Sequence, residues 1–100
     1  METHTGKWKV SSAETEDLIF ASPAACDVFL TVSKTGDPPP PIEVQVNGLV
    51  VPNGAMTRGE LSRTFRFSEV NTIHIITGAN PFPFGATGEY LITFEQPHTH

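Results

Sequence analysis

The sequence predicts an all-β fold, an antiparallel β-sandwich of about eight short strands, jelly-roll or immunoglobulin-like, with a small closed barrel as the alternative. Two observations lead to this fold class: apolar and polar residues alternate in short runs, and turn-forming residues separate the runs. No segment shows a helical period, and only residues 11–17 suit a single helical turn. The length of 100 residues suits one compact β domain over 1–100, with polar termini at about 1–5 and 97–100 expected to fray.

The strand-like runs can be followed along the chain from their alternation. Trp8 and Val10 share one face of the first run, and Val28, Leu30 and Val32 share one face of the third. The run at 70–77 is apolar on both faces, as is usual for a central strand. We expect strands at residues 7–12, 17–21, 27–33, 42–46, 49–51, 60–67, 70–77 and 89–95.

The strongest local signal is the pair Asn47-Gly48 between two of these runs. Asn and Gly tolerate the positive φ angles of a two-residue turn, so a β-hairpin is predicted here. The turn places Gln45 opposite Val50 on one face. The other face, expected to be buried, carries Val44, Val46, Leu49 and Val51.

Net charge and composition argue against two classes of partner, nucleic acids and membranes. The net charge is −5 and the six lysines and arginines are scattered, so no nucleic-acid surface is expected. With 38% apolar and 17% charged residues the chain should fold as a soluble protein, and it has no apolar window long enough to enter a membrane.

The single cysteine, Cys26, cannot form an internal disulfide and is expected to be a small buried apolar residue. The first twenty residues lack the pattern of a secretory signal. The single cysteine favours the cytoplasm, and the localisation is otherwise not predicted.

Catalytic and phosphate-binding motifs are absent, which favours a non-enzymatic role without a cofactor. One enzymatic hypothesis stays open, a small β-barrel with a pocket around His74, Arg63 and Tyr90. Arg63 interrupts an apolar face and would need a carboxylate partner if buried. No metal site is expected; the candidate ligands are His4, His98 and His100, in polar terminal segments.

The segment 78–88 carries Asn80, Phe82 and Phe84 among prolines and glycines, where a connection is normally polar. The two rings either close the core or form a stiff apolar contact surface. Phe29 and Leu91 fall on the outer side of their strands and are left over once the core is filled.

These features predict a non-catalytic interaction or assembly module that forms a homo-oligomer or docks on another protein, with Asn80, Phe82, Phe84, Phe29 and Leu91 as contact residues. The alternative is a carbohydrate-binding, lectin-like module. Against it, Trp8 and Tyr90, the only Trp and Tyr, both fall on predicted core faces.

Overall fold

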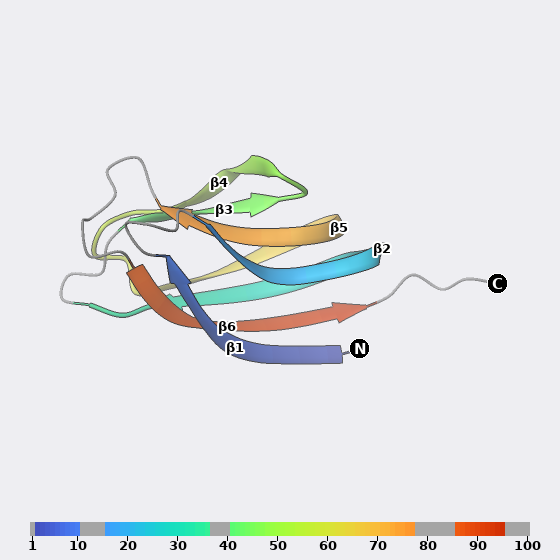
Figure 1. The fold of residues 1–100 in the computed structure, drawn as a ribbon, viewed down its shortest axis with the longest axis horizontal. Helices are drawn as coiled ribbons and strands as arrows, with labels where there is room; N and C mark the ends of the chain where they lie inside the picture. Colours follow the sequence, from blue (N-terminus) through green and yellow to red (C-terminus); the bar gives the residue numbers. More distant parts are fainter. Residues whose placement is uncertain (1, 11–15, 37–40, 78–85, 96–100) are drawn as a thin grey trace.

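The computed structural model describes residues 2–10, 16–36, 41–77 and 86–95. These residues form six strands in one antiparallel sheet, in the order β1-β6-β2-β5-β3-β4 (Figure 1). The strands are β1 (Glu2–Val10), β2 (Glu16–Lys34), β3 (Ile42–Val46), β4 (Leu49–Met56), β5 (Ser62–Thr77) and β6 (Ala86–Glu95).

Eight predicted runs become six strands because two pairs of runs are fused. The runs at 17–21 and 27–33 are both part of β2, and those at 60–67 and 70–77 are both part of β5. The stretches between the runs are bulges, with register shifts from Ala21 to Cys26 on β2 and a positive φ of 57° at Glu69 on β5. Bulges bend a strand without ending it, so each pair of runs that was expected to form two strands forms one.

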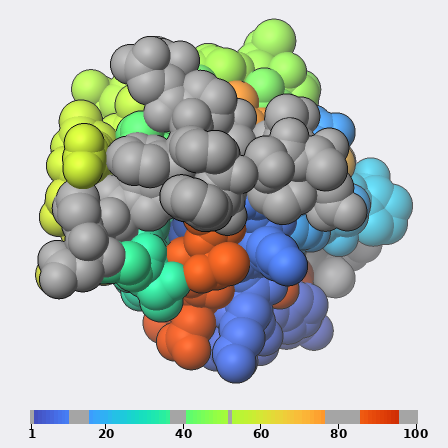
Figure 2. All heavy atoms as spheres, turned by 60° about the vertical axis from the view of Figure 1, so that its left-hand side comes forward, coloured from blue at the N-terminus to red at the C-terminus, as the bar shows by residue number. Residues whose placement is uncertain are grey.

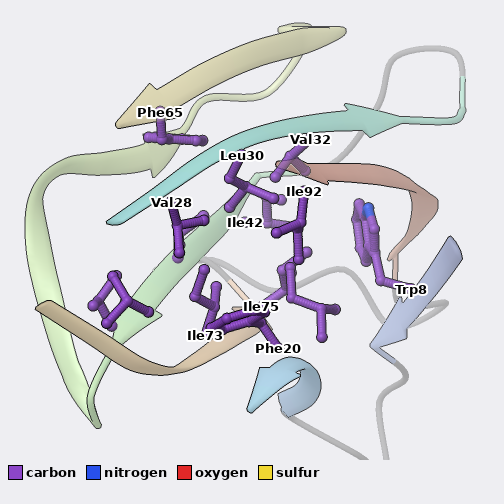
Figure 3. Close-up of a cluster of buried hydrophobic side chains, with 14 of the residues drawn as sticks. Trp8, Phe20, Val28, Leu30, Val32, Ile42, Phe65, Ile73, Ile75 and Ile92 are labelled. Carbon is purple, nitrogen blue, oxygen red and sulfur yellow. The ribbon is translucent and has the colours of Figure 1, made fainter. Parts of the chain in front are cut away.

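The bends give the two halves of each long strand different neighbours. The C-terminal half of β2 pairs with β6 and with the first half of β5, while the second half of β5 pairs with β3 and the start of β2. The sheet therefore folds over, and Leu30 and Ile92 point towards Ile73 and Ile75 from its other half (Figure 3).

The all-β, antiparallel prediction is confirmed. The barrel alternative is wrong, because among the described residues β1 and β4 each pair with a single neighbour and the ladder does not close.

The core follows the alternation of the runs, but three leucines in the inward phase of their runs are exposed. Leu18 is 51% exposed because a register shift between Leu18 and Phe20 turns Ile19 inward instead. Leu61 is exposed because it precedes β5, and Leu49 because it lies at the hairpin tip. The side chains buried most completely include Trp8, Leu30, Ile42, Met56, Ile73, Ile75, Ile92, Val10, Val28, Val32, Val44 and Val70.

The predicted hairpin is present. Asn47 and Gly48 form the turn with φ angles of 54° and 81°, and Val46 pairs with Leu49 as expected. Val44 and Val46 are buried, but Leu49 is 71% exposed, since the tip extends past the residues that would cover it.

The first residues, for which fraying was predicted, lie in a strand. Residues 2–5 belong to β1 and pair with Leu91–Phe94 of β6. The ring of His4 packs edge-on against Phe94 with centroids 5.1 Å apart. Residues 97–100 lie outside the described residues.

Candidate functional site

Two predicted contact residues lie on the outer face of the half-sheet β1-β6-β2-β5. Phe29 pairs with Thr93 of β6, and Leu91 pairs with Thr31 of β2, so the two apolar side chains are diagonal neighbours. They are 46% and 43% exposed. We call this surface the Phe29/Leu91 face.

Polar side chains hold the Phe29/Leu91 face in place. The guanidinium carbon of Arg66 lies 5.5 Å from the centre of the Phe29 ring, a cation–π contact that covers part of the ring. The hydroxyl oxygens of Thr31 and Thr64 are 3.0 Å apart across β2 and β5. Phe29 is therefore held in a defined position and is still accessible to a partner.

The same face contains a shallow hollow of about 430 Å³. Hydroxyl groups line it together with the cross-strand pair Lys7 and Glu89. Its side-chain lining also includes Thr5, Thr31, Ser33, Tyr90 and Leu91. Such a lining can accept polar groups of a partner next to the apolar contact of Leu91.

The second outer face lies on the other half of the sheet, which is formed by the start of β2, the second half of β5, β3 and β4. One row of paired residues crosses it, from Leu18 through His74 and Gln45 to Val50. Its two ends are apolar and about half exposed, at 51% for Leu18 and 54% for Val50. Residues 16–21, 42–56 and 69–77 of this half contain no lysine or arginine.

The edge strands are a third candidate contact surface, after the two outer faces. The outer backbone groups of an edge strand can pair with another strand. On β1, Asp17 Oδ2 accepts the backbone N–H of Lys9 at 2.8 Å. By the alternation of an antiparallel ladder, the backbone groups of Thr3, Thr5 and Lys7 point to the same open side. Among the described residues, a side-chain hydrogen bond caps the β1 edge only at Lys9.

The β4 edge is better protected. Nη1 of Arg63 donates to the backbone carbonyls of Asn53 and Ala55 at 2.8 and 3.1 Å. Its Nε and Nη2 donate to the carboxylate of Glu60 at 2.7 and 2.9 Å. Arg63 thus has the carboxylate partner that the sequence required, and it ties β4 to β5.

The residues of the enzymatic hypothesis do not come together. Arg63 and Tyr90 both pair with Val32, whereas His74 pairs with Leu18 and Gln45 on the outer face of the other half-sheet. Nδ1 of His74 is buried without a hydrogen-bond partner among the described residues. The geometry therefore offers no catalytic arrangement of these three side chains.

The remaining predicted positions lie partly inside and partly outside the described ranges. Cys26 is buried as predicted, at 2% exposure, with Sγ 3.3 Å from the carbonyl of Ala24. Five of the predicted site residues lie outside the described ranges: Asn80, Phe82, Phe84, His98 and His100. Among the described residues, no three His, Cys, Asp or Glu residues are grouped so as to hold a metal ion.

One buried polar residue was not predicted. Lys34 is 5% exposed, and its Nζ donates to the carbonyl of Thr57 at 2.8 Å. Burial lowers the pKa of Lys34, against the opposite effect of nearby Glu60. The signal was present in the sequence, since Lys34 continues the inward phase of Leu30 and Val32.

The comparisons with known proteins bear on the fold. Over the described ranges the structure has no helix long and apolar enough to cross a membrane. No family model matches the chain, and no curated protein matches it. The structure is similar to a solved structure described as "Bacillus endospore appendages form a novel family of disulfide-linked pili", with a TM-score of 0.64 and 18% identity over 93% of this chain and 82% of that one. At this identity the likeness shows that the two chains share a fold.

Proposed function

We propose that this chain is a non-catalytic β-sandwich module that assembles with copies of itself. The observation that carries the proposal is the set of apolar side chains on the outer faces of the sheet. Phe29 and Leu91 lie on one outer face, and Leu18 and Val50 lie on the other, each between 43% and 54% exposed. Apolar surface on both faces favours contacts that cover it.

The open edge of β1 supports the same proposal. An edge strand that is capped at one end and lies next to an apolar face is a liability for a monomer and a ready contact for a partner. Charge repulsion does not oppose contact at the Phe29/Leu91 face, because it carries cations (Lys7, Lys9, Arg66) and anions (Asp27, Glu89, Glu95) in equal number.

The shared fold also favours assembly, because in the Bacillus appendages this fold belongs to a pilus protein. Those pili are described as disulfide-linked. The present chain has one cysteine, which is buried, and a chain of disulfide-linked subunits needs at least two per subunit. We therefore propose that the copies associate without covalent links.

The solution mass tests this proposal. Light scattering and sedimentation over a range of micromolar concentrations should show a species larger than 10.9 kDa. Phe29→Ser and Leu91→Ser should each weaken association about tenfold or more, as expected of exposed apolar residues that become buried in an interface. Leu61→Ser is the matched control, since Leu61 is 63% exposed but precedes β5 and lies off the outer face.

A monomeric mass at every concentration would contradict the proposal. It would also be contradicted if Phe29→Ser and Leu91→Ser both associated as strongly as the parent protein does. The carbohydrate-binding alternative would then need an aromatic platform other than Trp8, which is 1% exposed and cannot stack on a sugar ring. Phe29 beside the hydroxyl-lined hollow is the described aromatic residue best placed for that role.

A further inference from the structure

The edge strand β1 fills a defined space beside β6, which we call the β1 slot. It pairs along its whole length with β6, and its inward residues Trp8 and Val10 are 1% and 0% exposed. Figure 2 shows the atoms of β6, in orange-red, next to those of β1, in blue. Without β1, the core would lose two of its buried side chains and β6 would lose one of its two neighbours.

The β1 slot is specific for the sequence of β1. Trp8 pairs with Gly88, where a Cβ atom would lie 2.7 Å from the indole ring, and its Nε1 donates to the carbonyl of Ser33 at 3.1 Å. Gly6 pairs with Tyr90, and a Cβ at Gly6 would lie 2.5 Å from the tyrosine hydroxyl. Two glycines, one on each strand, thus make room for two aromatic rings.

The covalent connection between β1 and the next strand is short. Five residues, 11–15, separate Val10 from Glu16. A hydrogen bond from the Lys9 backbone N–H to Asp17 links β1 to β2 beyond that connection. Exchange of an edge strand between copies is a low-cost route to association, because the same contacts form with either copy, and a short hinge is the kind of connection at which it occurs.

We propose that β1 is exchanged between copies of this chain, so that β1 of one copy fills the β1 slot of another. This inference rests on the proposed self-assembly and adds a second contact between the copies to that of the outer faces. The occupant is fixed by complementarity, since a second copy supplies the same Trp8, Gly6 and Val10. Reciprocal exchange gives a closed dimer, and exchange in one direction gives an open chain.

Disulfide trapping across the two strands tests the exchange. Lys7 and Glu89 are directly opposed and exposed, and they form a non-hydrogen-bonded pair, where Cβ atoms come close enough for a disulfide. Lys7→Cys and Glu89→Cys are combined in a Cys26→Ala background. The variant protein is assembled under reducing conditions, then oxidised and run on a denaturing gel without reductant. Exchange predicts covalent dimers or a ladder, and the reduced sample must run as monomer.

The matched control is Thr31→Cys with Thr64→Cys in the same background. The two hydroxyl oxygens are 3.0 Å apart on strands of one copy, so this pair should give only intrachain disulfides. If assembled protein with the Lys7→Cys and Glu89→Cys pair also gives only intrachain disulfides, the exchange is overturned and self-assembly is left intact. Parent protein that stays monomeric at every concentration would overturn both proposals.

Discussion

The side-chain oxygen of Asn47 accepts the backbone N–H of Asn71 at 2.7 Å, so the turn of the β3–β4 hairpin holds the bulge of β5. The same oxygen accepts the N–H of Thr72, and Nδ2 of Asn47 donates to the carbonyl of Glu69. Glu69 has a φ of 57°, a conformation that few non-glycine residues adopt. Asn47 therefore does more than permit a tight turn.

Replacement of Asn47 by Gly separates these two roles. Glycine keeps the positive φ of the turn but removes three side-chain hydrogen bonds, so Asn47→Gly should lower the free energy of unfolding by about 1–3 kcal/mol. Urea unfolding measures the change. Asn47→Ala should cost more, because alanine also disfavours the left-handed conformation. Equal stability of the glycine variant and the parent would mean that the hydrogen bonds to β5 contribute nothing net.

The hairpin also offers two opposed residues with different burial. Val46 is 8% exposed and pairs with Leu49, which is 71% exposed. Val46→Asp should destabilise the protein by several kcal/mol, about 3–5, since it buries an unpaired carboxylate. Leu49→Asp introduces the same charge on the directly opposed residue and should change stability by about 0.5 kcal/mol or less. A comparable loss in both variants, measured by chemical denaturation, would refute the observed orientation.

Most of the strands could be predicted from the sequence because alternation depends on local residues alone. Val28, Leu30 and Val32 are all buried, and Trp8 and Val10 lie on the predicted face. The bulges were not predictable in the same way. Ile19 is buried in place of Leu18 because β2 has one residue more than β5 between their paired positions, a property of two strands and not of either sequence run.

The candidate site shows the same limit. Phe29 and Leu91 could be assigned to the surface, since they oppose the inward phase of their strands. The contact of Arg66 with Phe29 could not, because it requires the pairing of β2 with β5, which no local pattern encodes. For Lys34, the alternation of its strand indicates the inward direction of the side chain. Its hydrogen-bond acceptor, the carbonyl of Thr57, is distant in the sequence and could not be predicted.

Lys34 predicts a pH dependence of stability. Its pKa is lowered from 10.5 by burial, so the unfolded chain binds a proton more tightly at this site than the folded protein does. The parent protein should therefore gain stability relative to Lys34→Met as the pH rises from below the lowered pKa towards 10.5. Methionine preserves the packing of the aliphatic stem and cannot titrate. Urea unfolding of both proteins at matched pH values gives the difference, and two parallel pH curves would contradict the lowered pKa.

The close packing around Gly88 gives the last prediction. A Cβ atom at this position would overlap the carbonyl oxygen of Ser33 and lie 2.7 Å from the indole ring of Trp8. Because the obstacle on one side is backbone, Gly88→Ala should cost about 1–3 kcal/mol or more of stability. The emission of Trp8, the only tryptophan, should shift to longer wavelength as the ring is displaced towards solvent.

Gly48→Ala is the matched control for this substitution. Gly48 has a φ of 81° with no atom within 4 Å of the added Cβ, so that alanine carries backbone strain alone. It should cost about 1–2 kcal/mol and leave the Trp8 emission unchanged. A Gly88→Ala protein with the stability and emission of the parent would show that Trp8 does not fill the space above Gly88, and the sequence specificity of the β1 slot would lose its main support.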